Sequence, residues 1–260
     1  GSFFVPGMGV GSSIDPIPLA NIVRGVGNKG IRGCGSMSFV DSSGFVRIWG
    51  EIVDDPTIET SVPLEPVVAS SVVATDHAFA AVTTAGIGVA WGATSHGGLI
   101  AGETACNLAS RVEHIFAIND TFAAIVELSG TKRVVVWPER KNEWYSNPPL
   151  AITSSDSSSA SVADIYTTDC AFAVRLADGN VHTWGWNSCG GDSSRVQSQL
   201  VNVKTITSSA GAFVAQTEVC NDVDCFPGQT VVWGNPEFGG NPSADVLQRL
   251  QSGVRAVYAD

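Results

Sequence analysis

The stretch that decides the fold is residues 162–185, which read Val-Ala-Asp-Ile-Tyr-Thr-Thr-Asp-Cys-Ala-Phe-Ala-Val-Arg-Leu-Ala-Asp-Gly-Asn-Val-His-Thr-Trp-Gly. Two short runs of alternating apolar residues, 171–176 and 181–184, flank the sequence Ala-Asp-Gly-Asn. Asp-Gly between two alternating runs is a strong signal for a β-hairpin. A third apolar run, 162–166, precedes them. The stretch therefore predicts a unit of three antiparallel strands.

This unit recurs along the chain. Its clearest mark is Val-x-x-Trp-Gly or a near variant, in which the tryptophan repeats at intervals of 42, 46, 47 and 49 residues. A period in this range is typical of solenoids, propellers and arrays, whose stacked units share their cores. We therefore expect the repeated tryptophans to be buried at equivalent positions between neighbouring units. They are Trp49, Trp91, Trp137, Trp184 and Trp233.

The units differ mainly in the length of the hairpin tip. The repeated Phe and Trp are separated by 12 residues in units two and four, by 15 in unit three and by 20 in unit five. Insertions of this kind map to loops on one rim of a repeat protein, which is often the binding face. The first unit is looser, because Met37 stands where the other units carry Phe.

Five units are readable, over approximately residues 20–66, 67–111, 112–161, 162–202 and 203–253. The two ends of the chain indicate one shared, partial unit, formed by residues 3–19 and 254–260. We therefore expect a single all-β domain over residues 1–260, a β-propeller of about six blades. Two alternatives stay open. The ring is closed by strands from both termini, which removes exposed sheet edges, or it is truncated from a longer propeller.

The repeated unit resembles that of the RCC1-like β-propeller family (regulator of chromosome condensation repeats). In that family an apolar strand, a short turn, a small-aromatic-small strand, a glycine hairpin and Val-x-x-Trp-Gly follow one another. The resemblance covers roughly residues 20–260. Because the family includes exchange factors for a small GTPase, ubiquitin-ligase subunits and secreted β-lactamase inhibitors, it implies protein binding through rim loops. The motif is specific for the blade and identifies no ligand.

Composition narrows the choice of partner. The chain carries 14 basic and 25 acidic residues, a net charge of −11. Nucleic-acid binding needs clustered Lys and Arg, so we expect no nucleic-acid partner. A protein partner with a basic surface would be attracted instead. No apolar run approaches the 18 residues of a membrane span, so we expect no membrane insertion.

The six cysteines bear on the cellular compartment. Cys220 and Cys225 bracket the longest hairpin tip, where two antiparallel arms bring their Cα atoms within disulfide reach. Cys170 and Cys189 fall at the same end of one blade, so a second bridge is geometrically possible. The alternative is that all six are reduced and act as small hydrophobes. We favour at least one disulfide, which indicates a secreted or cell-surface protein, with a cytoplasmic location as the alternative.

A first candidate site is the turn before each repeated Phe. It carries Asp76, Asn119, Asp120 and Asp169, which in a ring would meet at one mouth of the channel and attract a cation or basic peptide. The favoured interpretation is structural, because Asp and Asn in such turns hydrogen-bond their own backbone.

A second candidate is the loop after Trp137, which replaces Gly with Pro. It carries Arg140, Lys141, Trp144 and Tyr145, residue types enriched at interface hot spots. Packing of Trp144 over its own blade is the equal alternative. A third candidate, the acidic tip at 220–228, lacks the Gly and distal Glu of a calcium loop, so we expect no metal there.

Catalytic motifs are missing from the sequence, including Gly-x-Ser-x-Gly, phosphate-binding Gly loops and zinc spacings. His77, His96, His114 and His182 fall at different repeat positions, so we expect them not to share a site. The sequence therefore favours a protein that is not an enzyme, has no cofactor and presents rim loops to a protein partner. The alternatives are a lectin-like propeller with Trp144, Tyr145 or Trp186 as stacking platforms, and an exchange-factor-like regulator of a small GTPase.

Overall fold

The structure is a computed structural model of the 260-residue chain. It describes residues 22–27, 37–49, 60–61, 67–109, 111–139, 145–149, 152, 161–221, 224–251 and 253–259. The chain forms two compact units. One consists of Gly1–Leu128 with Val135–Glu139, and the other of Ser129–Val134 with Arg140–Asp260. Among the described residues, no helix is long and apolar enough to cross a membrane.

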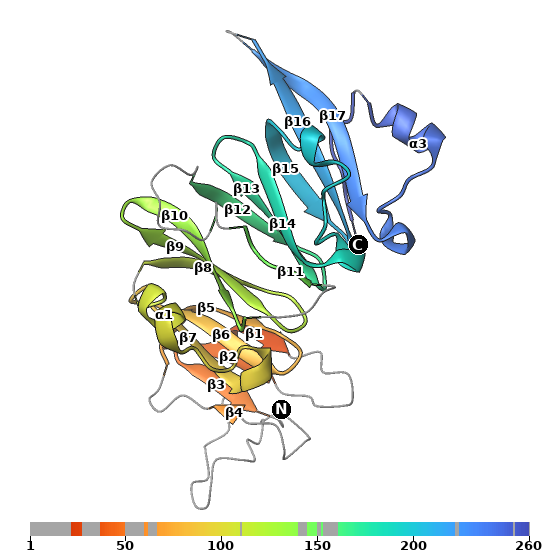
Figure 1. The fold of residues 1–260 in the computed structure, drawn as a ribbon. Helices are drawn as coiled ribbons and strands as arrows, with labels where there is room; N and C mark the ends of the chain where they lie inside the picture. The colour runs from red at the N-terminus through yellow and green to blue at the C-terminus, as the bar shows by residue number, and fades with distance from the viewer. Residues whose placement is uncertain are drawn as a thin grey trace, which may run out of the picture. The chain divides into compact units, whose positions relative to one another are not determined.

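The architecture is an all-β propeller whose blades are antiparallel meander sheets, five of them in the described part of the chain (Figure 1). Blade 1 contains β1 (Ile22–Gly27), β2 (Met37–Asp41) and β3 (Val46–Trp49). Blade 2 contains β4 (Thr60–Ser61), β5 (Ala69–Ala74), β6 (Ala78–Thr83) and β7 (Gly88–Ala93). Blade 3 contains β8 (Val112–Ala117), β9 (Phe122–Leu128) and β10 (Thr131–Trp137). Blade 4 contains β11 (Tyr145–Ser146), β12 (Val162–Thr167), β13 (Ala171–Leu176) and β14 (Val181–Trp186). Blade 5 contains β15 (Val203–Ser208), β16 (Ala212–Cys220) and β17 (Cys225–Gly234).

Short helices follow the last strand of several blades, where we expected only loops. They are η2 (Thr94–His96), α1 (Gly102–Asn107), η3 (Asn187–Cys189), η4 (Gln197–Gln199), η5 (Pro236–Phe238) and α3 (Ala244–Arg249). Three of them, η2, η3 and η5, end at a glycine in the left-handed conformation. These glycines are the first members of the Gly-Gly pairs in the sequence. The Gly-Gly pair therefore ends the helical turn after each Trp strand.

Blades 2 to 5 each contain one cross-strand aromatic pair. In blades 2, 4 and 5 the repeated Phe and Trp lie directly opposite each other on adjacent strands. Four such pairs are buried and stacked, and their ring centroids are 4.9–5.7 Å apart. They are Phe79 with Trp91, Phe122 with Trp137, Phe172 with Trp184, and Phe213 with Trp233. The repeat predicts equivalent positions for the tryptophans, and these four occupy them. In blade 1, Trp49 pairs with Met37 along the backbone.

The tryptophans also connect neighbouring blades. Trp137 Nε1 donates to the Gly97 carbonyl at 3.0 Å, and Trp233 Nε1 donates to the Gly190 carbonyl at 3.1 Å. Both acceptors belong to the Gly-Gly loop of the preceding blade. Within the described residues, the buried Nε1 atoms of Trp91 and Trp184 have no partner. The loops before these two blades contain no Gly-Gly pair.

The glycine after the repeated tryptophan is required by the backbone. Gly185 has φ +113°, and a Cβ there would lie 2.7 Å from both the Ala171 Cα and the Cys170 carbonyl oxygen. Gly92 and Gly234 are equally crowded, with φ +109° and +115°. In blade 3 the position is Pro138, and the peptide bond that precedes it is cis. The Trp-Gly dipeptide therefore follows from close approach of two strands and not from a ligand.

We predict that Gly185→Ala destabilises the protein more than Gly130→Ala. Gly130 also has a positive φ, +81°, but a Cβ there meets nothing within 4 Å. Both variants carry the backbone strain, of about 1 kcal/mol or more. Only Gly185→Ala adds steric overlap, which should lower the free energy of unfolding by about 1–3 kcal/mol more. Chemical denaturation of the two variants measures the difference, and equal destabilisation would contradict the steric explanation.

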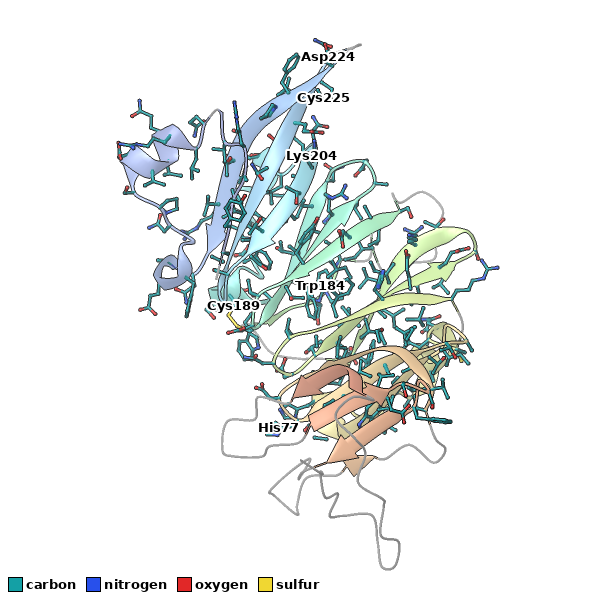
Figure 2. The ribbon with its side chains drawn as sticks, turned by 180° about the vertical axis from the view of Figure 1, so that it is seen from behind. His77, Trp184, Cys189, Lys204, Asp224 and Cys225 are labelled. Atoms are coloured by element: carbon teal, nitrogen blue, oxygen red, sulfur yellow. A yellow bond between two sulfur atoms is a disulfide. The ribbon has the colours of Figure 1, made fainter. Side chains whose placement is uncertain are left out.

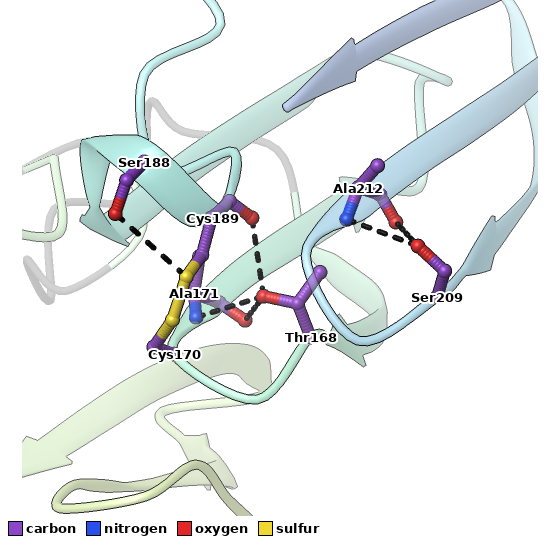
Figure 3. Close-up of a disulfide and its surroundings, with 7 residues drawn as sticks. All are labelled: Thr168, Cys170, Ala171, Ser188, Cys189, Ser209 and Ala212. Atoms are coloured by element: carbon purple, nitrogen blue, oxygen red, sulfur yellow. Dashed lines mark hydrogen bonds between the residues drawn. A yellow bond between two sulfur atoms is a disulfide. The ribbon is translucent and has the colours of Figure 1, made fainter. Parts of the chain in front are cut away.

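A repeated hydroxyl holds the turn before each Phe strand. Thr168 Oγ1 accepts from the Ala171 N–H at 3.0 Å and donates to the Cys189 carbonyl at 3.1 Å (Figure 3). Thr75 and Ser209 make the same bonds in blades 2 and 5. We expected Asp and Asn to hold this turn, but the preceding residue does so in these three blades. The signal is visible in the sequence as a Thr or Ser four residues before Phe.

Two expectations about unit boundaries need correction. Residues 60–61 and 145–146 form β4 and β11, which are outer strands of blades 2 and 4. The boundaries at 66 and 161 therefore do not coincide with the sheets, because the connection before a blade supplies its outermost strand. The expected strand at 254–260 does not form over 254–259. There the Val254 carbonyl accepts from the Gln216 side chain at 3.3 Å instead of pairing with a strand. Residues 3–19, its expected partner in the sixth blade, lie outside the described residues.

Candidate functional site

The feature that distinguishes blade 5 is a long hairpin. β16 and β17 continue to Cys220 and Cys225, while the matching hairpin of blade 4 turns between β13 and β14. In Figure 1 the β16–β17 hairpin projects past β15 and past the tips of β13 and β14. We name residues 218–227 the arm. The length of the hairpin agrees with the 20-residue separation of Phe and Trp in this unit.

A register shift between Gln216 and Glu218 marks the base of the arm. The residue in the shift, Thr217, is buried, and its Oγ1 donates to the Gln229 carbonyl at 3.1 Å. Gly228 lies against this hydroxyl, and a Cβ there would overlap Thr217 Oγ1. A shift of this kind bends a hairpin and increases its twist. The arm is therefore attached to the blade through a fixed joint.

The end of the arm is closed by two devices. Cys220 and Cys225 pair in register and form a disulfide, with their Cα atoms 4.0 Å apart. Beyond them, the Asn221 N–H donates to the Asp224 carbonyl at 2.9 Å, and the Asp224 N–H donates to Asn221 Oδ1 at 2.7 Å. Asp222 lies outside the described residues. The predicted bridge is confirmed, and it fixes the shape of the hairpin tip.

The arm exposes an apolar pair. Val219 and Phe226 lie directly opposite each other, and 63% and 53% of their surface is exposed. Both are large hydrophobic residues, and neither belongs to an apolar cluster of the described residues. At the base lies Lys204 of β15, which is labelled in Figure 2 with Cys225 and Asp224 of the arm. Lys204 forms an ion pair with Glu218. The arm thus presents a rigid hydrophobic contact beside charged groups, which is the chemistry of a protein-binding surface.

A shallow groove lies between the base of the arm and the hairpin tip of blade 4. Its walls include Asp178, Gly179, Lys204 and Glu218. The groove floor is held by backbone bonds, because the Val203 N–H donates to the Gly179 carbonyl at 2.9 Å. A Cβ at Gly179 would lie 2.9 Å from the Asn202 Cα, so glycine permits this close approach. The groove and the arm together form the candidate site.

Metal binding at the arm does not fit its chemistry. Ligand atoms of Glu218, Cys220 and Cys225 lie within 4.8 Å of one another. The two sulfur atoms are bonded to each other, however, and only a thiolate is an effective sulfur ligand. In addition, Glu218 is paired with Lys204. The cluster is therefore a disulfide beside an ion pair.

The structure brings together some of the candidate residues in the turns before the repeated Phe. The Asp76 N–H donates to the Asn119 carbonyl at 2.7 Å, and the Asp169 N–H donates to the Ala210 carbonyl at 2.9 Å. Ala210 is three residues before Phe213, which is the position that Asp76, Asn119 and Asp169 occupy in their own blades. Successive turns are thus linked through the backbone. Asp120 Oδ1 accepts from Thr121 Oγ1 at 3.0 Å. These contacts give the turns a structural role, and their binding role stays a prediction.

Most of the loop after Trp137 lies outside the described residues, including Arg140, Lys141 and Trp144. Tyr145 pairs with Trp186 along the backbone of β11 and β14. Trp186 packs, half-buried, against the apolar cluster of blades 4 and 5. This position weakens the expectation that Trp186 is a stacking platform for sugar. The binding role of the loop stays a prediction.

The second predicted disulfide is also present. Cys170 and Cys189 are bonded, with their Cα atoms 5.8 Å apart, at the corner where the turn before β13 meets η3 (Figure 3). Cys189 is buried in the apolar cluster of blades 4 and 5. Cys106 is exposed and unpaired. The two bridges therefore differ in place, one at the core and one at the tip of the arm.

We predict different consequences of removing the two disulfides. Cys170→Ser with Cys189→Ser should lower the stability by up to about 3 kcal/mol, because this bridge closes the longer loop and adjoins the core. Cys220→Ser with Cys225→Ser should leave the melting temperature nearly unchanged and let thermolysin cleave the arm faster. Thermal unfolding and mass spectrometry of the fragments measure both effects. A large loss of melting temperature from the arm variant would show that the arm is part of the core.

A titratable group lies on the blade next to the arm. Burial lowers the pKa of His182 on β14 below 6.5, and the nearby Asp178 carboxylate opposes this in part. The folded state therefore favours neutral His182, while the unfolded chain takes up a proton at about pH 6.5. Above pH 6.5, His182 is neutral in both states and its contribution to stability is complete. As the pH falls from 6.5 toward the folded pKa, the unfolded chain is protonated at this residue while the folded protein is not, so the free energy of unfolding decreases.

We predict that His182→Gln reduces the pH dependence of stability. Between pH 7.5 and pH 5 the wild-type protein should lose more unfolding free energy than the variant, because only wild-type His182 must charge on acidification. Urea denaturation at the two pH values measures this difference. An equal loss in both proteins would contradict the role of His182.

One expectation about the histidines is wrong. His77 and His96 were expected not to share a site, but their rings meet in a T-shaped contact with centroids 4.6 Å apart. The turn before β6 and the helical turn η2 converge in the fold, although their residues hold different repeat positions. His114 lies elsewhere, exposed on β8 against Phe116.

Comparison with known proteins finds similar solved structures but no family. No family model matches the chain, and no curated protein matches it. Similar solved structures include the ectodomain of the receptor kinase CR4 from Physcomitrella patens, with 13% identity and a TM-score of 0.47 over 78% of this chain and 52% of that chain. Human WBSCR16 has 14% identity and a TM-score of 0.48 over 89% and 68% of the two chains. Prp20p from Saccharomyces cerevisiae has 12% identity and a TM-score of 0.42 over 78% and 56%.

This chain spans about half the length of the first of these, 52%. All three scores are below 0.5. The propeller architecture is therefore defined by the chain's own repeated blades.

Proposed function

We propose that this chain is a non-catalytic, protein-binding propeller with RCC1-like repeats, and that the arm is its principal contact element. The observation that carries the proposal is the exposed pair Val219 and Phe226 on a hairpin closed by a disulfide. Large apolar residues held outward on a rigid element lose little entropy on binding. A hairpin that served only to connect two strands would not need large apolar residues exposed beside a disulfide.

The charge of the arm indicates the partner. Glu218, Asp222 and Asp224 are acidic, and the whole chain has a net charge of −11. A partner with a basic rim around an apolar pocket complements this combination. Complementary charge mainly increases the association rate and makes it sensitive to salt.

A secreted or cell-surface location is part of the same proposal. Two disulfides are present in the described residues. Disulfides persist in oxidising compartments and are rare in the cytosol. A binding surface whose shape depends on the Cys220–Cys225 bridge is suited to such a compartment.

The test combines site-specific crosslinking with two matched variants. A photo-crosslinking residue at position 226 should capture a partner from the native source, and one at position 99 should not. Leu99 is a fair control, because 51% of its surface is exposed and it lies in the other compact unit, after blade 2. The captured protein is then produced and its affinity for this chain is measured directly.

We predict that Val219→Ser with Phe226→Ser weakens binding of that partner at least about tenfold, because a real anchor contributes about 2 kcal/mol or more. Leu99→Ser should bind like the wild type, and all variants should melt at nearly the same temperature. Trp144→Ala with Tyr145→Ala tests the loop after Trp137 in the same assay. Full loss of binding in this loop variant and normal binding in the arm variant would move the interface to the loop.

A further inference from the structure

Blades 2, 4 and 5 close one corner in different ways. The corner is formed by two positions, one residing two residues before the repeated Phe and the other five residues after the repeated Trp. In blade 4 these positions are Cys170 and Cys189, which form the disulfide. In blade 5 they are Gly211 and Phe238, and a Cβ on the glycine would lie 2.6 Å from the Phe238 ring. The fold thus brings the two positions into direct contact.

In blade 2 the corner positions are His77 and His96. Their backbones are held as in blade 4. The His77 carbonyl accepts from the Ala93 N–H at 2.9 Å, and the His96 carbonyl accepts from Thr75 Oγ1 at 3.1 Å. The matching bonds in blade 4 join Trp186 to Cys170 and Thr168 to Cys189. Backbone bonds therefore place the two imidazoles together, independently of any bond between the rings.

The hydrogen bonds of the ring nitrogens indicate what the two imidazoles can bind. His77 Nδ1 is buried and has no hydrogen-bond partner within the described residues. An unsatisfied buried nitrogen is costly, so a ligand that accepts its lone pair is favoured. His96 Nδ1 lies 2.9 Å from Ser95 Oγ. When this hydroxyl accepts the Nδ1 hydrogen, Nε2 carries the lone pair, which is how an outer partner orients a metal-binding histidine.

We propose that His77 and His96 bind one divalent transition-metal cation, such as Zn²⁺, Ni²⁺ or Cu²⁺. Neutral imidazole suits these ions, whereas Mg²⁺ and Ca²⁺ prefer oxygen. The bound ion joins the corner of blade 2 as the disulfide joins that of blade 4. Because the protein supplies two ligands, water completes the coordination. The site lies in the first compact unit, whereas the arm lies in the second, so the proposal does not depend on the protein-binding function.

The test is calorimetric titration of the chain, produced without a histidine tag, with ZnCl₂ and separately with MgCl₂. We expect one Zn²⁺ per chain, no Mg²⁺ binding and a higher melting temperature with Zn²⁺. Loss of an outer-shell partner alone weakens metal sites 10–100-fold, so His77→Ala and His96→Ala should each weaken Zn²⁺ binding at least about tenfold. His114→Ala is the matched control and should bind like the wild type.

A second variant protects the test against misfolding of the alanine variants. His77→Cys with His96→Cys should form a disulfide, as the equivalent positions do in blade 4, and keep the corner closed without imidazoles. Its oxidised form, verified by mass spectrometry, should melt normally and lose the Zn²⁺ site. The proposal is overturned if the wild type shows no saturable Zn²⁺ binding. It is equally overturned if the oxidised double variant binds Zn²⁺ as tightly as the wild type.

Discussion

Blades 2 to 5 depend on one contact, the stacking of a Phe on the Trp of the adjacent strand. The pair is buried in blades 2 to 5. Stacking at this point fixes the register of the two central strands, because a slip of one residue would turn both rings to the other face. It also aims the indole of Trp137 and Trp233 at the preceding loop. One pair of side chains therefore acts both within a blade and between blades.

The crowded glycines follow from the same contact. With the Trp strand held against the Phe strand, the backbone of Gly185 passes directly over Ala171. The first glycine of two Gly-Gly pairs lies at the interface with the next blade, since a Cβ on Gly97 would lie 2.6 Å from the Phe122 ring and one on Gly190 would lie 2.8 Å from the Phe213 ring. At Gly239 a Cβ would meet nothing within 4 Å among the described residues. The same glycine is thus sterically required only where another blade packs against it.

Much of this architecture could be predicted from the sequence, because it rests on local signals that repeat. The Asp-Gly hairpin, the apolar alternation and the Trp-Gly dipeptide each have a direct structural cause, and the strands form where they indicate. The disulfide of the arm could be predicted for the same reason, since its two cysteines bracket a hairpin tip. The boundaries of the blades could not, because β4 and β11 are strands of only two residues with no pattern of their own.

The candidate sites are harder to predict from the sequence than the strands, because they depend on contacts that no local pattern shows. His77 and His96 are 19 residues apart and belong to different local patterns, so only the convergence of two turns brings them together. Thr75, Thr168 and Ser209 repeat in register, but Thr and Ser are so common in this chain that the repeat does not stand out in the sequence. Val219 and Phe226 lie beyond the register shift between Gln216 and Glu218, and no residue type in the sequence predicts that shift.

The register shift has a consequence for the redesign of this protein. The ladder of blade 5 continues past the shift to Cys220 and Cys225, but Val219 and Phe226 belong to none of the described apolar clusters. Substitutions at Val219 and Phe226 therefore leave the buried pair of Phe213 and Trp233 unaffected. Under the proposed binding role, the contact residues of the arm can be changed while the blade that carries them is retained. The same separation makes the end of blade 5 a suitable place to graft a different hairpin.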